Sequence, residues 1–183
     1  IVRKVKSKGF SLIDYLGLKL LGVLSYILRP VVLFIVTERV RVASKGIINN
    51  ANPRKLKNYL REKSKTDVDI NLNLLGEAVL GEEEADNRFN DLLNLMEIDE
   101  VNYVSVKVSA IVSQIIPSDL KGSCERVAQK LRVIYRKSLK NNCFINLDME
   151  EFKDFEITLD VFKQLLMEEE FKNLYAGIVL QAY

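Results

Sequence analysis

Apolar and polar residues follow two alternating patterns from residue 68 onward. Short apolar stretches rich in β-branched residues are typical of buried strands. They occupy residues 68–76, 103–112, 143–148 and 176–183. Between them, apolar residues recur every three or four positions, as on one face of a helix. These helical segments are 82–96, 123–139 and 155–166. The pattern predicts four strands separated by three helices.

Strands that alternate with helices pair in parallel through right-handed crossovers, so the predicted fold class is α/β. The strand centres lie roughly 30 to 40 residues apart, which suits the βα units of either a doubly wound sheet or an eightfold barrel. Neither a Gly-x-Gly-x-x-Gly sequence after the first strand nor a Gly-Lys-Ser/Thr sequence occurs. Their absence argues against a nucleotide-binding doubly wound sheet.

The first third of the chain differs from the rest in charge. Residues 1–65 carry 15 basic and 3 acidic side chains, whereas residues 66–183 carry 12 and 22. Such an imbalance indicates either an anionic partner or a basic helical layer over an acidic body. Because the basic residues are interspersed with apolar ones, we favour the layer and expect no nucleic-acid partner. We therefore assign residues 1–66 to a basic helical segment that packs on the domain formed by residues 67–183.

The most apolar run of the chain, residues 20–36, is interrupted by Arg29 and Pro30. A membrane-spanning helix needs about 20 consecutive apolar residues, and a proline inside a helix removes a hydrogen bond. The run therefore predicts two short, packed helices that meet at Pro30. A peripheral contact with a membrane surface stays open as an alternative.

Composition limits the chemistry that this chain can perform. Apolar residues make up 48% and charged residues 28% of the chain, as in soluble globular proteins, and we expect a cytoplasmic protein. There is no histidine, and the two cysteines, Cys124 and Cys143, have no metal-ligand spacing. A zinc site, a disulfide framework and a cysteine nucleophile are thus disfavoured. Proton transfer would use carboxylates, lysine, tyrosine or a cofactor.

Four polar residues lie at or near the C-terminal ends of the predicted strands: Glu77, Lys107, Asp148 and Gln181. Active sites of parallel barrels form at that end from several strands. Lys107, between two valines, needs an anionic partner, which a substrate carboxylate, a cofactor phosphate or one of these acids would supply. Asp148 is equally explained as a helix cap, Gln181 as an interior hydrogen-bonding group and Glu77 as a turn residue.

Four sequence segments together resemble one enzyme family. They read "NLNLLGEAVLGEEEADNRF", "YVSVKVSAIVSQ", "FINLDMEEF" and "AGIVLQAY". In order and spacing they look like the first four strands of flavin-dependent proline dehydrogenases, in particular of the bifunctional enzymes called proline utilisation A. The segment "RPVVLFIVTERVRVASKGIINNANP" is similar to the helices that precede that barrel. The resemblance implies the first half of a (β/α)8 barrel, about four βα units, preceded by a helical segment.

The resemblance also implies a role for each matching residue. Lys107 would hold the carboxylate of proline, and Asp148 would be a catalytic-site acid close to substrate and flavin. Met149 would contact FAD, and Gln181 would form a hydrogen bond with the flavin ring. Glu77 would form an ion pair with an arginine of the last barrel helix and so help to close the site.

The implied reaction is oxidation of L-proline to Δ1-pyrroline-5-carboxylate, with hydride transfer to FAD and electrons passed on to a quinone. A covalently linked glutamate-semialdehyde dehydrogenase module is the implied partner. The chain reaches only the fourth strand, and four strands cannot close an eight-stranded barrel, so we expect this chain alone to be inactive. Two alternatives stay open: a non-catalytic half-barrel that serves as an interaction protein, and a different barrel enzyme with an anionic substrate.

Overall fold

The computed structural model describes residues 15–17, 19–20, 22, 29–44, 47–49, 52–66, 68–74, 79–113, 115–149 and 152–180. The chain divides into two compact units, Ile1–Asn50 and Ala51–Tyr183. The boundary that the charge distribution suggested, at residue 66, thus falls inside the second unit. Helix α3 (Pro53–Lys63) explains the difference, because it buries Leu56 and Leu60 in the core of that unit.

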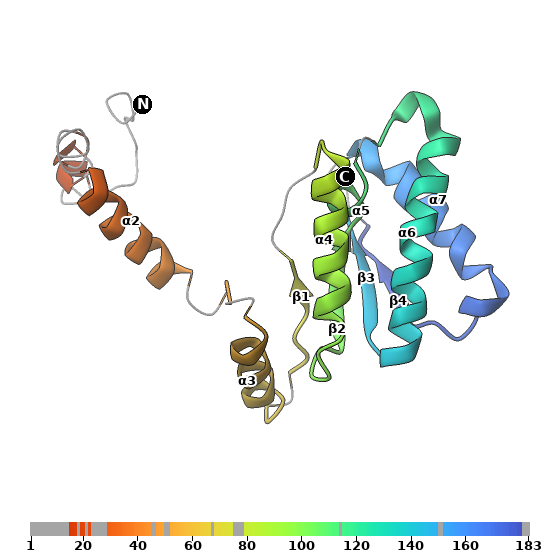
Figure 1. The fold of residues 1–183 in the computed structure, drawn as a ribbon, viewed down its shortest axis with the longest axis horizontal. Coiled ribbons are helices and arrows are strands. Elements are labelled where there is room, and N and C mark those ends of the chain that lie inside the picture. The colour runs from red at the N-terminus through yellow and green to blue at the C-terminus, as the bar shows by residue number, and fades with distance from the viewer. Residues whose placement is uncertain are drawn as a thin grey trace. The chain divides into compact units, whose positions relative to one another are not determined.

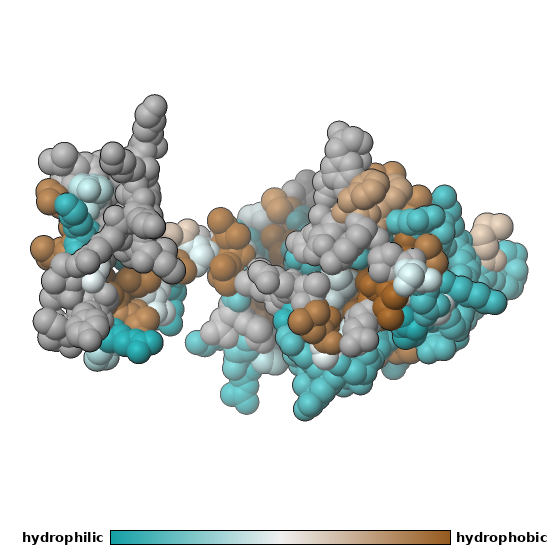
Figure 2. All heavy atoms as spheres, turned by 90° about the horizontal axis from the view of Figure 1, so that it is seen from above, coloured by the Kyte–Doolittle hydropathy of each residue, from teal (hydrophilic) through white to brown (hydrophobic). Residues whose placement is uncertain are grey.

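In the first unit, helix α2 (Arg29–Ala43) has Pro30 in its first turn. Backbone N–H groups in the first turn make no helical hydrogen bond, so a proline there costs none. The helix begins where the sequence predicted a junction between two helices, and most of the preceding predicted helix lies outside the described residues. None of the α2 residues is buried, and Phe34 is 68% exposed. Figure 2 shows apolar and polar side chains mixed on the visible surface of this unit. No helix in the described part of the chain is long and apolar enough to cross a membrane.

The second unit contains a four-stranded parallel sheet with strand order β1-β2-β3-β4 (Figure 1). The strands are β1 (Leu72–Asn73), β2 (Tyr103–Lys107), β3 (Phe144–Asp148) and β4 (Ala176–Ile178). The main connecting helices are α4 (Glu82–Leu95), α6 (Leu120–Asn141) and α7 (Phe155–Leu166), with short helical turns at η2 (Pro117–Asp119), η3 (Phe152–Asp154) and η4 (Glu169–Phe171). The α/β class and the parallel pairing predicted from the sequence are confirmed, and the three described βα units and the fourth strand follow the order of a partial barrel.

Local sequence signals explain where the connecting helices begin and end. Helix α4 starts with three glutamates, which suit the positive end of the helix dipole. At the start of α6 the side chain of Asp119 accepts a hydrogen bond from the backbone N–H of Gly122. Asn142, in the left-handed conformation with φ of 49°, ends the same helix. These signals place each helix close to its predicted range.

One face of the sheet is a continuous apolar core. In β2 and β3 the side chains of Val104, Val106, Ile145 and Leu147 are at most 2% exposed. They belong to one cluster with apolar residues of all three connecting helices, among them Leu92 of α4, Leu131 and Ile134 of α6, and Val161 and Leu165 of α7. The helices therefore cover this face, and burial of this surface is the main source of stability.

The second strand is shorter than its apolar alternation predicted. It ends at Lys107, and Val108–Ile111 form a helical turn, α5. Lys107 pairs with Asp148, the last residue of β3, so residues beyond it lack a partner on that side for their backbone hydrogen bonds. A helical turn pairs those groups internally and still buries Val108 and Ile111. The first and fourth strands are likewise shorter than predicted, and residues 75–78 and 181–183 lie outside the described part.

Candidate active site

The other face of the sheet is polar, because successive side chains of a strand point to opposite sides. The strand register places Asn73 opposite Ser105, Ser105 opposite Asn146, and Lys107 opposite Asp148. Each of these residues alternates along its strand with apolar residues that belong to the core or pack against it. This inner face therefore presents amide, hydroxyl, ammonium and carboxylate groups on neighbouring strands.

The inner face is built in layers along the strands. At the N-terminal end, the rings of Tyr103 and Phe144 pack edge to face with their centroids 4.9 Å apart. In the next layer, the Ser105 hydroxyl oxygen accepts hydrogen bonds from Nδ2 of Asn71 at 2.9 Å and of Asn146 at 3.4 Å. Ser105 is only 4% exposed, so this network satisfies a buried hydroxyl. The layer supports the C-terminal edge, where the strands end.

At the C-terminal edge, Lys107 and Asp148 are the last residues of their strands and are direct partners in the ladder. The carboxylate of Asp148 is held on both oxygens. Oδ2 accepts a hydrogen bond from Nδ2 of Asn73 at 3.3 Å, and Oδ1 accepts one from the backbone N–H of Met149 at 3.2 Å. The residue that precedes α7 is Asp154, so Asp148 belongs to the sheet edge and does not occupy the cap position of that helix.

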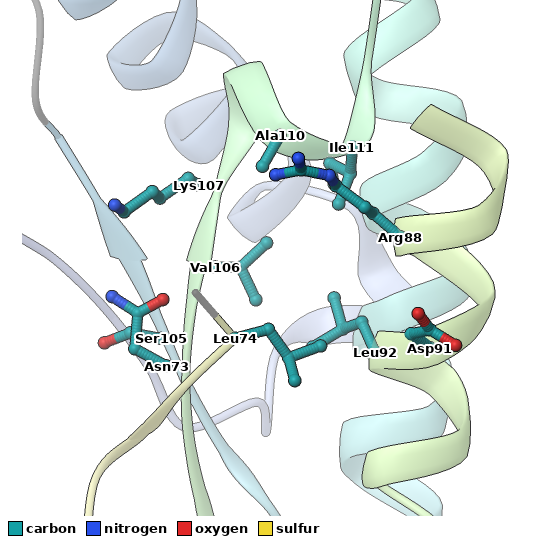
Figure 3. Close-up of a pocket in the computed structure, with 10 residues that line it drawn as sticks. All are labelled: Asn73, Leu74, Arg88, Asp91, Leu92, Ser105, Val106, Lys107, Ala110 and Ile111. Carbon is teal, nitrogen blue, oxygen red and sulfur yellow. The ribbon is translucent and has the colours of Figure 1, made fainter. Parts of the chain in front are cut away.

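Next to this edge lies a cavity of about 110 Å³ between the strands, α4 and α5, and Lys107 is one of the residues that line it. Figure 3 shows the side chains of Lys107 and Asn73 on one side of the strands and that of Val106 on the other. Val106 and Val108 are each 2% exposed, whereas Lys107 is half-buried. A lysine in this position keeps its ammonium group at a polar edge while its neighbours pack in the core.

Of the five residues singled out from the sequence, the structure brings three together at this edge: Lys107, Asp148 and Met149. Met149 is 3% exposed, so little of its surface is open in this unit. Glu77 and Gln181 lie outside the described residues, and their roles stay predictions.

Sequence reasoning missed the polar residues that support this edge. Asn71, Asn73, Ser105 and Asn146 stand at every second position of "NLNL", "VSVK" and "FINLD", and that alternation was a usable signal for a polar inner face. It also missed Arg88 of α4, which lines the cavity and donates a hydrogen bond to Oε1 of Glu84 at 2.6 Å. An i, i+4 pair of this kind is common on helices, so the sequence offered no signal for Arg88.

Cys143 belongs to the apolar core cluster, and Cys124 packs against it. Burial raises the pKa of the Cys143 thiol to about 11. Burial also raises the pKa of Cys124, and the nearby carboxylates of Asp160 and Glu156 raise it further. A thiol that stays protonated at neutral pH is a poor nucleophile and a poor metal ligand. Within the described residues, no group of three or more histidine, cysteine, aspartate or glutamate side chains could hold a metal ion.

Comparison with known proteins agrees with this geometry. The family model for proline dehydrogenase matches residues 56–183. Proline Utilization A (PutA) from Corynebacterium freiburgense is 44% identical, with a TM-score of 0.74, over 79% of this chain and 15% of that one. PutA from Bdellovibrio bacteriovorus, solved after inactivation by N-propargylglycine, is 31% identical, with a TM-score of 0.67, over 72% of this chain and 16% of that one.

A more distant match shares the fold alone. A PutA mutant from Bradyrhizobium japonicum is 20% identical, with a TM-score of 0.67, over 88% of this chain and 18% of that one. No protein with curated annotation matches this sequence. The chain thus spans less than a fifth of the length of each of these structures.

Proposed function

This chain belongs to the proline dehydrogenase family, and we propose that it supplies half of a barrel site that oxidises L-proline to Δ1-pyrroline-5-carboxylate with FAD. The observation that carries the proposal is the pairing of Lys107 with Asp148 at the C-terminal edge of adjacent parallel strands. That edge is where barrel enzymes bind their substrates. A cation and an oriented carboxylate there suit a small zwitterionic amino acid.

Each side chain has a distinct task in the proposed reaction. The Lys107 ammonium holds the carboxylate of proline through a charge-assisted hydrogen bond and so orients the ring. The carboxylate of Asp148, held on both oxygens, gives the site a fixed negative group close to the secondary amine. In the proposed oxidation of the neutral amine, the ring carbon bonded to nitrogen loses a hydride to the oxidised flavin, the nitrogen lone pair forms the C=N bond, and the N–H proton passes to solvent.

The residues of this edge fit a flavin. A flat heterocycle with both donors and acceptors needs donors and acceptors opposite it, and Asn73, Lys107 and Asp148 provide both kinds of group on three strands. FAD would accept the hydride and pass the electrons to a quinone. We propose that Met149 and Gln181 contact the flavin and that Glu77 forms the ion pair that closes the site.

We further propose that this chain works only as part of a longer protein. It spans 15% and 16% of the two more similar PutA chains, and four strands cannot enclose the interior of an eight-stranded barrel. The remaining strands would complete the substrate and cofactor sites, and a linked glutamate-semialdehyde dehydrogenase module would take the product. We expect the 183-residue chain by itself neither to bind FAD tightly nor to oxidise proline.

The test uses the full-length protein that carries this segment. Its flavin absorbance and its proline-dependent reduction of a quinone analogue are measured for the natural protein and for Lys107→Met. We expect stoichiometric flavin in both, and in the variant a loss of kcat/KM for proline of about 10- to 150-fold, because a hydrogen bond to a charged group is lost. Lys140→Met, an exposed lysine in the last turn of α6, is the matched control and should behave like the natural protein. A colourless protein without proline-dependent electron transfer contradicts the proposal and favours a non-catalytic half-barrel.

A further inference from the structure

We infer that Asn73 is a positioning residue that fixes the carboxylate of Asp148 for the reaction, a role that rests on the proposed function of this site. Nδ2 of Asn73 donates a hydrogen bond to Oδ2 of Asp148 at 3.3 Å. Asn73 lies on β1 and Asp148 on β3, and the strand order places β2 between them. The contact therefore crosses a whole strand on the inner face of the sheet.

The identity of the residue between them makes the crossing possible. The strand register places Ser105 next to Asn73. The side chain of Ser105 is short, and its hydroxyl already accepts hydrogen bonds from the amides of Asn71 and Asn146. The amide of Asn73 thus reaches past Ser105 to the next strand. A larger residue at position 105 would lie in the path of this contact.

The amide at position 73 has a chemical consequence for Asp148. The other oxygen of Asp148 is already held by the backbone N–H of Met149, so the bond from Asn73 leaves the carboxylate with a single orientation. An aspartate at position 73 would be unable to donate this bond and would place a second negative charge beside Asp148. It would also compete with proline for the ammonium group of Lys107. Asn73 is exposed, so packing does not require an asparagine there.

The chain offers a matched control in Asn71. It is the same residue type two positions earlier, but its amide donates to the Ser105 hydroxyl at 2.9 Å and not to Asp148. Leucine and aspartate are both close to asparagine in size. Substitutions at positions 71 and 73 therefore separate loss of the Asp148 contact from general disturbance of the inner face.

The kinetic test compares Asn73→Leu, Asn73→Asp and Asn71→Leu in the full-length protein. We expect Asn73→Leu to lower kcat about 10- to 100-fold with a smaller change in KM, because a hydrogen bond to a charged group is lost while Lys107 still binds the substrate carboxylate. Asn73→Asp should lower kcat further and also raise KM. Asn71→Leu removes a hydrogen bond to the Ser105 hydroxyl and leaves the Asp148 contact in place, so it should lower kcat less than Asn73→Leu does.

A second readout needs neither flavin nor turnover. In the 183-residue chain, the side-chain amide NMR signals of Asn73 should shift in the Asp148→Ala variant, whereas those of Asn71 should stay in place. If Asn73→Leu keeps full kcat, or if the Asn73 amide signals do not respond to Asp148→Ala, the inference is wrong. If the natural full-length protein does not oxidise proline, the proposed function fails, and the NMR comparison still decides whether Asn73 holds Asp148.

Discussion

The two faces of the four-stranded sheet differ in polarity and burial. On the outer face, Val106 and Leu147 are at most 2% exposed and pack against the connecting helices. On the inner face, their neighbours Lys107 and Asp148 are half-buried and surrounded by amides and a hydroxyl. Adjacent residues of one strand thus serve two different purposes, because a strand turns alternate side chains to opposite sides.

Stability and the proposed chemistry therefore depend on different faces of the sheet. Apolar burial on the outer face, where the side chains of β2 and β3 are valine, isoleucine and leucine, contributes most of the free energy of folding. The inner face holds its polar groups in place through contacts among themselves, which keeps them available at the edge of the sheet. Substitutions on the two faces should therefore separate effects on stability from effects on activity.

The largest expected effect on stability is at Leu147, on the outer face of β3. Leu147 is fully buried, so Leu147→Ala should lower the free energy of unfolding by about 2–5 kcal/mol through lost burial and the cavity left behind. Asn146→Ala, the adjacent residue on the inner face, loses only a weak hydrogen bond at 3.4 Å and should cost about 1 kcal/mol or less. Urea unfolding of the 183-residue chain followed by circular dichroism measures both. Equal losses at the two positions would refute the division between the faces.

A smaller loss is expected at Gly177 on the inner face of β4. A Cβ added there would lie 3.0 Å from Oδ1 of Asn146 and 3.0 Å from Cζ of Phe144. Those side chains would have to shift, so Gly177→Ala should cost about 1–3 kcal/mol of stability. The same urea measurement tests this, with the open position Gly81, where nothing lies within 4 Å of an added Cβ, as the matched glycine-to-alanine control. A variant at position 177 as stable as the control would show that the inner face is not closely packed there.

Low pH should weaken ion pairs on the outside of the helical layer. A hydrogen bond from Lys137 lowers the pKa of Glu97, and one from Arg136 lowers that of Glu170, both below the usual 4.5. A carboxyl whose pKa falls on folding stabilises the folded state fully above its unfolded pKa and loses that contribution as the pH drops through the folded value.

We therefore expect the thermal midpoint to be steady above pH 4.5 and to fall below it. Thermal unfolding at a series of pH values measures this, and the double variant Glu97→Gln and Glu170→Gln should show a shallower decline below that pH. An unchanged slope in the variant would mean that these two pairs add nothing to the stability of the helical layer.

The smallest effect is expected inside the core. Tyr135 of α6 is fully buried, its ring packs edge to face on Phe171 at 5.6 Å, and burial raises the pKa of its hydroxyl. That hydroxyl has no hydrogen-bond partner among the described residues. Tyr135→Phe removes it and keeps the ring, so stability should change by less than about 1 kcal/mol or rise slightly. Tyr135→Leu, which loses the ring pair, should be clearly less stable in the same assay. A large loss in Tyr135→Phe would reveal a partner for the hydroxyl.

Much of the fold was predictable because its signals are local. The apolar faces of α4, α6 and α7 repeat at helical spacing, and the helices lie close to their predicted ranges. The end of β2 was not predictable, because the alternation continues through Val108 and only the length of β3 stops the strand. The place of α3 in the second unit was also missed, since its basic composition resembles that of the preceding residues and only its packing assigns it.

The order of strands and helices, the α/β class and several polar residues at strand ends can be predicted from the residues alone, because hydrophobic periodicity and residue type are properties of short segments. Which polar side chains meet depends on the three-dimensional alignment of the strands. Asn73 and Asp148 are 75 positions apart, and their contact depends on the register of three strands and on a small residue between them. Such a contact arises from how the strands align across the sheet, which no single segment encodes.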